Sequence, residues 1–239
     1  MNCCLMKMNK CLFVILFTIQ TFTGFTQSIE KWFVYNKPIN GYDVKTHWLG
    51  DKSQGYWGTA SFYFTKGGKT KVLTQMVDLD GWFDDETFNN SPDTIVLNQY
   101  YDKSMQPYLD RHTFVEFGDY NFDGEDELVI CDSPKPWKGD VADRWLDCEN
   151  FTFYKDYPEG FVQINNVPFY RLSTETCRMY YDFDLKNKTL LLITSGGACC
   201  YTSTTYYFKE GQPYKSMEIR HEDLVDRVVN DTVTHVFRH

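Results

Sequence analysis

Short runs of apolar and aromatic residues, each ended by glycine, proline, asparagine or aspartate, limit the fold of this chain more than any other feature. Residues 56–64 and 71–77 form two such runs on either side of Gly67 and Gly68, which is a hairpin pattern. About ten runs of this kind follow one another at regular spacing, and apolar residues almost never recur with a helical period. We therefore predict an all-β fold, either a small β-propeller or, alternatively, a β-sandwich.

The length and composition favour one domain. The chain has 239 residues, of which 42% are hydrophobic and 18% aromatic, and this is enough to bury one sizeable core. No strict internal repeat is visible, so the blades of a propeller would be degenerate. We predict a single all-β domain over residues 27–239.

The N-terminus has the pattern of a secretory signal peptide. Lys7 and Lys10 precede an apolar run over residues 11–19, and small and polar residues lead from there to Gln27. The run is shorter than the ~20 residues that a membrane-spanning helix needs. We predict a signal peptide over residues 1–26 and an exported protein, periplasmic or secreted, with no membrane span after cleavage. An uncleaved N-terminal anchor is the alternative.

The net charge limits the class of partner. The formal charge is −9, and loss of Lys7 and Lys10 with the signal peptide makes it −11. An acidic surface repels nucleic acid and anionic lipid, and it attracts basic proteins. We expect no nucleic-acid partner.

Export changes how the cysteines are interpreted, because disulfides persist in oxidising compartments. The five cysteines outside the signal peptide are Cys131, Cys148, Cys177, Cys199 and Cys200. We favour Cys131 paired with Cys148, and Cys177 paired with Cys199 or Cys200, since each pair closes a modest loop. The odd number implies a free thiol, an interchain bridge or a vicinal bridge at residues 199–200. A zinc site is disfavoured because there is no Cys-x-x-Cys and no nearby histidine pair.

Residues 119–127 place oxygen-bearing groups at alternate positions of a loop. The candidate ligands are the main-chain carbonyl of Glu125 and four side chains, those of Asp119, Asn121, Asp123 and Glu127. A hard cation takes six to eight oxygens at about 2.3–2.6 Å, and a short loop supplies them when alternate side chains converge. Gly124 allows the sharp turn. We predict a structural Ca²⁺ site, with a metal-free acidic hairpin turn as the alternative.

The loop is not an EF-hand, and its neighbours are strand-like. An EF-hand requires glutamate at the twelfth position, where this chain has Ile130. Strand-like runs lie on both sides, at residues 113–117 and 128–130. We therefore predict a metal-clasped turn between two strands.

Residues 117–128 resemble the Asp-x-Asn-x-Asp-Gly-x-x-Asp-Leu loops of FG-GAP and related repeats. With the stretches at residues 150–154, 160–161 and 196–200, the chain is similar to the XAC2610-related family of small exported bacterial proteins, from about Trp32 to the C-terminus. This resemblance implies a periplasmic, calcium-bound, propeller-like protein that inhibits lysozyme-like effectors delivered by type IV secretion. Glu127 departs from the pattern, which usually has aspartate at that place, so metal geometry or affinity is expected to differ.

Catalytic patterns are missing from the sequence. The five histidines show no metal-ligand spacing, and there is no Gly-x-Ser-x-Gly elbow. Cys199 is a better disulfide candidate than a nucleophile in an exported chain. A carboxylate pair for glycoside hydrolysis needs a separation that a sequence does not show. We expect no enzymatic activity.

Residues 195–201 are the first candidate for a partner-binding loop. The candidate contact residues are Ser195, Gly196, Gly197 and Tyr201. Two glycines let the chain protrude, the adjacent cysteines hold its base, and the tyrosine would fill a sugar cleft. The alternative is a covalently tied hairpin turn. The acidic stretch at residues 78–86 is a second candidate, either a rim for a basic partner or a solvated loop.

Two functions fit these observations. The first is an inhibitor or immunity protein that binds a lysozyme-like cell-wall hydrolase, with Ca²⁺ in a structural role. The alternative is a Ca²⁺-dependent surface, adhesion or glycan-binding module without inhibitory activity.

Overall fold

The computed structural model describes residues 28–51, 55–79, 90–97, 109, 113–134, 145–195, 200–224 and 227–236. The predicted signal peptide, Gly196, Gly197 and Cys199 lie outside these ranges, as does most of the acidic stretch at residues 78–86. Within these ranges, no helix is long and apolar enough to cross a membrane.

The first sheet has the strand order β4-β3-β2-β1-β5. Its strands are β1 Ser28–Tyr35, β2 Asp43–Asp51, β3 Trp57–Lys66, β4 Lys69–Asp78 and β5 Thr94–Leu97. Neighbours are antiparallel except β1 and β5, which are parallel. The predicted hairpin is confirmed, because β3 and β4 pair around Gly67 and Gly68, whose φ angles are +58° and +76°. Two positive φ angles are what the favoured two-residue hairpin turn requires.

The central sheet has the order β10-β9-β7-β6. Its strands are β6 Val115–Gly118, β7 Glu127–Cys131, β9 Phe151–Tyr157 and β10 Gly160–Gln163. Every residue of β6 and β7 is buried. Side chains alternate between faces along a strand, so Leu128 and Ile130 enter one core while Val129 and Cys131 enter the other. This explains why the sequence has a continuous apolar run after the acidic loop.

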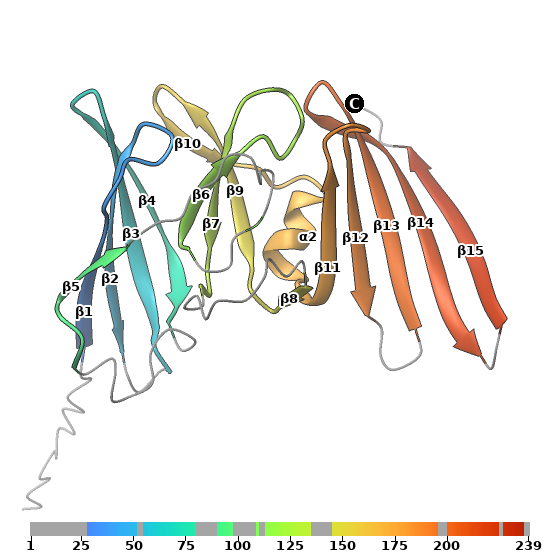
Figure 1. Cartoon of the computed structure of the whole chain (residues 1–239), viewed down its shortest axis with the longest axis horizontal. Coiled ribbons are helices and arrows are strands. Elements are labelled where there is room, and N and C mark those ends of the chain that lie inside the picture. Colours follow the sequence, from blue (N-terminus) through green and yellow to red (C-terminus); the bar gives the residue numbers. More distant parts are fainter. Residues whose placement is uncertain are drawn as a thin grey trace, which may run out of the picture.

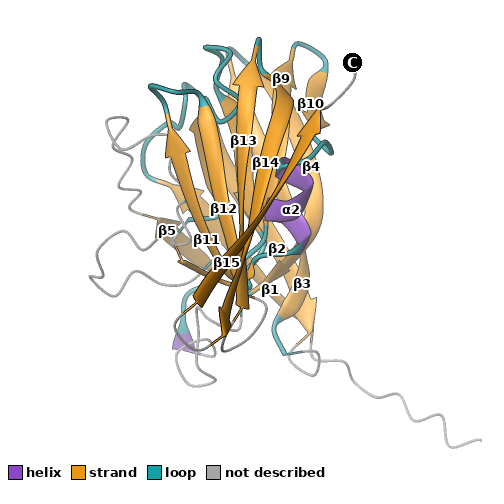
Figure 2. Cartoon of the chain, turned by 90° about the vertical axis from the view of Figure 1, so that its right-hand side faces the viewer, coloured by secondary structure: helices purple, strands orange, loops and turns teal. Residues whose placement is uncertain are grey.

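The third sheet has the order β15-β14-β13-β12-β11-β8. Its strands are β8 Trp145–Asp147, β11 Cys177–Asp184, β12 Thr189–Ser195, β13 Cys200–Lys209, β14 Gln212–Leu224 and β15 Arg227–Val236. The helix α2, Phe169–Thr174, connects the central and third sheets and buries Phe169 and Leu172. Figure 2 shows α2 beside strands whose axes are roughly aligned, with neighbouring strands of the third sheet antiparallel.

Two aromatic-rich cores hold the three sheets together. The first core joins the inner face of the first sheet to one face of the central sheet, through contacts such as Phe33 with Phe114, 4.8 Å between ring centroids. The second core lies between the central sheet, α2 and the third sheet, with Phe153 and Phe169 also 4.8 Å apart. Figure 1 shows the sheets as a row of three. The all-β prediction is confirmed, and the face-to-face packing is common to both architectures expected from the sequence.

The disulfide corrects the predicted pairings. Cys148 bonds Cys177, whereas we predicted Cys131 with Cys148 and Cys177 with Cys199 or Cys200. Strand pairing gives the reason. Cys177 lies opposite Asp147 in the β8–β11 pair, so Cys148 is close to it. Cys131 lies opposite Phe151 in the β7–β9 pair, and its free thiol is buried in the second core. Cys200 begins β13 with an exposed side chain.

Candidate metal centre

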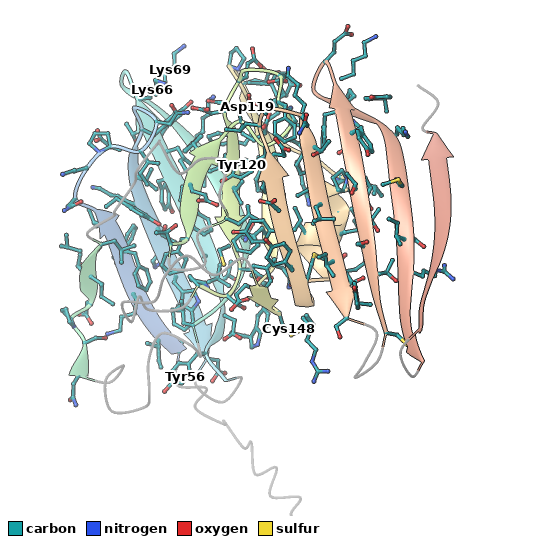
Figure 3. The ribbon with its side chains drawn as sticks, turned by 45° about the vertical axis from the view of Figure 1, so that its right-hand side comes forward. Tyr56, Lys66, Lys69, Asp119, Tyr120 and Cys148 are labelled. Atoms are coloured by element: carbon teal, nitrogen blue, oxygen red, sulfur yellow. A yellow bond between two sulfur atoms is a disulfide. The ribbon has the colours of Figure 1, made fainter. Side chains whose placement is uncertain are left out.

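The predicted metal loop connects β6 to β7 at one end of the central sheet. Figure 3 shows Asp119 at the upper edge of the molecule and Cys148 at the lower edge, so the loop and the disulfide lie at opposite ends. Two loop residues have positive φ angles, Phe122 at +63° and Gly124 at +94°. No heavy atom lies within 4 Å of a Cβ built on Gly124, so glycine is favoured there by its φ angle and not by lack of space.

The side chains at alternate positions turn inward and accept hydrogen bonds from the backbone of the loop. Asp119 Oδ2 accepts from Gly124 N at 3.0 Å, and Asn121 Oδ1 accepts from Asp123 N at 2.9 Å. Asp123 Oδ1 accepts from Glu125 N at 2.9 Å. The loop therefore brings the oxygens of three predicted ligands to its inner side.

Glu127 ends the loop and is the first residue of β7. Its side chain is fully buried, and Oε2 accepts hydrogen bonds from Tyr120 N at 2.9 Å and Asn121 N at 3.3 Å. Burial, followed by the charge of Asp123 and then that of Asp119, raises the pKa of Glu127 to about 8. A buried carboxylate whose pKa is raised so far lacks a compensating positive charge.

Two carboxylate oxygens of the loop have no hydrogen-bond partner among the described residues. They are Asp119 Oδ1 and Glu127 Oε1, and both atoms are buried. Burial also raises the pKa of Asp119, an effect that the hydrogen bond from Gly124 N opposes. Buried polar atoms in native proteins almost always have a partner, and a cation coordinated by both oxygens would supply one. The donor set, made only of oxygens, fits Ca²⁺.

Lys155 of β9 supplies a positive charge on one side of the loop. Its Nζ lies 2.7 Å from Asp123 Oδ2 and 3.0 Å from Glu125 Oε2. Burial alone would raise the pKa of Asp123, but Lys155 and the hydrogen bonds from Glu125 N and Asn121 lower it overall. In the present arrangement, the described residues contain no group of three or more His, Cys, Asp or Glu side chains that could hold a metal ion. A bound ion would therefore require the loop side chains to rearrange.

The loop also contacts the third sheet. Lys188 Nζ donates to Phe122 O at 3.0 Å, and the Phe122 ring packs on Phe208, 5.1 Å between centroids. A Cβ built on Gly211, in the β13–β14 turn, would lie 2.9 Å from both Cβ and Oδ2 of Asp123. The loop is thus fixed between the central and third sheets.

Sequence reasoning missed Lys155, Lys188 and Gly211 as neighbours of the loop. Each lies on another strand or turn, and its approach depends on sheet packing. The one local signal is that Lys155 directly follows the aromatic stretch at residues 151–154, which β9 includes.

The described ends of the predicted partner-binding loop are Ser195 and Tyr201, which lie on β12 and β13. Ser195 ends β12 and lies opposite Tyr201 in the β12–β13 pair, and Tyr201 is 44% exposed. Figure 1 shows the end of β12 and the start of β13 at the lower end of the third sheet, away from the β6–β7 loop. Gly196 and Gly197 fall outside the described residues, so their predicted role stays a prediction.

Comparisons with known proteins show a distant structural likeness. No protein-family model matches the chain, and no curated protein matches it. A solved structure described as "Structure of a Xanthomonas Type IV Secretion System related protein" is similar, at 14% sequence identity and a TM-score of 0.41. The alignment covers 86% of this chain and 93% of that chain.

Proposed function

We propose that this protein is an exported binding protein whose β scaffold is stabilised by Ca²⁺ in the loop at residues 119–127. The observation that carries the proposal is Glu127, which is fully buried inside an acidic loop and has one oxygen without a partner among the described residues. Removing a charge from water is costly unless an opposite charge compensates it. A divalent cation would compensate Glu127 and Asp119 together.

The expected role of the ion is structural. The ligand candidates face the inside of a loop that is packed against the second core and the β13–β14 turn. Ca²⁺ held by Asp119, Asn121, Asp123, Glu127 and the carbonyl of Glu125 would leave little room for a substrate. Its effect would be to fix the junction of the central and third sheets.

The target that we propose is a lysozyme-like cell-wall hydrolase, which the protein would inhibit by binding and not by catalysis. The resemblance of residues 117–128 and 196–200 to exported inhibitor proteins supports this target. The Cys148–Cys177 bridge is compatible with export, because disulfides persist in oxidising compartments. The acidic net charge would attract a basic enzyme.

The test uses the purified mature chain, residues 27–239, and a panel of lysozyme-like hydrolases encoded near its gene. We expect a stable complex by size-exclusion chromatography and a slower loss of turbidity in a wall-lysis assay. A Tyr201→Ala variant should weaken the complex, with Tyr157→Ala, another exposed tyrosine, as the matched control. If no hydrolase is bound or inhibited while a glycan array shows Ca²⁺-dependent binding, the protein is a glycan-binding module instead.

A further inference from the structure

A lysine of the neighbouring strand β9 places a positive charge at the acidic loop. The side chain of Lys155 reaches it from β9, and about 29% of that side chain is exposed. Its ammonium group contacts Asp123 Oδ2 and Glu125 Oε2, at 2.7 and 3.0 Å. Charge-assisted hydrogen bonds of this kind are among the stronger ones in proteins.

The same carboxylate is a predicted ligand of the metal ion. Asp123 Oδ2 already accepts from Lys155 and, at 3.1 Å, from Asn121 Nδ2. A divalent cation at Asp123 would therefore lie close to an ammonium group and repel it.

Asp123 has no space to avoid this conflict by turning toward the third sheet. The backbone of Gly211 fills that side so closely that even a methyl group there would meet Asp123 Oδ2 at 2.9 Å. The Asp123 carboxylate can contact Lys155 or a metal ion. The packing of the β13–β14 turn prevents it from moving to a position that would keep the ammonium group and the ion apart.

We propose that Lys155 is a built-in competitor of the metal ion: its ammonium group holds Asp123 and Glu125 when no cation is bound, and a bound divalent cation displaces it. The inference rests on the Ca²⁺ site of the proposed function and adds its regulation. Lys155 keeps the loop folded without metal and lowers its affinity for Ca²⁺, so that the loop fills only where Ca²⁺ is abundant. Extracellular Ca²⁺ modules, with dissociation constants of about 10⁻⁴–10⁻³ M, work in this range.

The first test is a calorimetric titration of the mature chain with CaCl₂, for the wild type, Lys155→Gln and Lys45→Gln. Lys45 is an exposed lysine of the first sheet, so its variant controls for the general loss of one positive charge. We expect Lys155→Gln to bind Ca²⁺ about fivefold more tightly than the wild type, which is the factor typical of losing one partly exposed ion pair. Lys45→Gln should change the affinity by less than about twofold.

The outcomes are distinct for the two proposals. Equal or weaker Ca²⁺ binding by Lys155→Gln, with clear binding by the wild type, would overturn the competitor role and leave the Ca²⁺ site standing. Binding by neither protein would remove the Ca²⁺ site and the competitor role together.

A second test needs no variant. Displacement should free the Lys155 amine, so an amine-reactive ester followed by mass spectrometry should label Lys155 at least about twofold faster in CaCl₂ than in chelator. Lys45 should label at the same rate in both, as an internal control. Equal labelling of Lys155 in both conditions would contradict the displacement, whether or not Lys155→Gln folds.

Discussion

Two turns between neighbouring strands of this protein hold their carboxylates in opposite ways. In the turn between β11 and β12, Asp184 Oδ1 accepts from the backbone N of Lys186 and Asn187 at 2.9 and 3.1 Å, and Oδ2 accepts from Asn187 Nδ2 at 2.6 Å. The Asn187 side chain and backbone lower the pKa of Asp184. In the loop between β6 and β7, burial raises the pKa of Asp119 and Glu127, and an oxygen of each lacks a partner among the described residues.

The difference sets the carboxylates of the β6–β7 loop apart from an ordinary turn. A turn needs one acceptor side chain to satisfy its backbone N–H groups, and Asp184 does this alone in contact with water. The β6–β7 loop satisfies its backbone and still has buried carboxylate oxygens left over. Turn formation does not explain these oxygens, whereas the proposed coordination of a cation would.

Substitution of Glu127 should give the largest effect. Glu127→Ala removes the acceptor of Tyr120 N and Asn121 N and leaves a cavity, so we expect a loss of about 3 kcal/mol in the free energy of unfolding. Glu127→Gln keeps an acceptor of the same shape without the charge, and in chelator it should cost less than about 1 kcal/mol. Urea unfolding monitored by tryptophan fluorescence in EDTA measures both. A loss for Gln as large as for Ala would mean that the charge itself stabilises the loop without any cation.

The pH dependence of stability should follow from Glu127 when no cation is present. Its folded-state pKa of about 8 lies above the ordinary value of 4.5, so the folded state binds a proton more tightly than the unfolded state. This contribution is complete below pH 4.5 and is lost as the pH rises toward about 8, by roughly 2–4 kcal/mol. Unfolding in EDTA at a series of pH values measures it.

Two results would mark the pH effect as belonging to Glu127. The decline between pH 4.5 and 8 should disappear in Glu127→Gln, and it should be suppressed in the wild type by saturating CaCl₂, because the metal favours the charged carboxylate. Asp184, with its lowered pKa, acts in the opposite sense, and its contribution is lost only as the pH falls below about 4. The same decline in wild type and Glu127→Gln would assign it to another group.

Gly211→Ala tests the packing of the loop against the third sheet. The new methyl group would lie 2.9 Å from Asp123, at a residue whose φ is +75°, so we expect a loss of about 1–3 kcal/mol. Gly160→Ala is the matched control, since no heavy atom lies within 4 Å of a Cβ there and its φ is not positive. Thermal unfolding of both variants should separate them, and equal stability would contradict the contact.

The smallest effect is expected for Asp184→Ala. The turn is exposed to solvent and its carboxylate bonds only to nearby groups, so the melting temperature should fall by about 1–2 °C, equally in CaCl₂ and in chelator. A Ca²⁺-dependent change in this variant would show that the β11–β12 turn also binds the ion.

The sequence predicted the local features of this molecule better than the long-range ones. The hairpin at Gly67-Gly68 and the strands on both sides of the acidic loop follow from turn chemistry and side-chain alternation. The short helix α2 has no side-chain cap at Pro168, and its position depends on the burial of Phe169 and Leu172. The Cys148–Cys177 bridge depends on the pairing of β8 with β11, which joins segments separated by 29 residues and leaves no local pattern.

The residues of the candidate site also differ in how far the sequence predicts them. Asp119, Asn121, Asp123 and Glu127 could be read from their spacing, because one loop holds them all. Lys155 and Gly211 reach Asp123 from β9 and from the β13–β14 turn, so only the packing of the sheets reveals them.

The most direct measurement is the melting temperature of the wild-type mature chain in saturating CaCl₂ and in chelator, beside Asp123→Ala. We predict that Ca²⁺ raises the wild-type melting temperature by about 5–10 °C, which corresponds to ~2.7 kcal/mol at a hundredfold excess over the dissociation constant, and leaves Asp123→Ala unchanged. Identical melting of the wild type in CaCl₂ and in chelator would contradict a Ca²⁺ site in the β6–β7 loop.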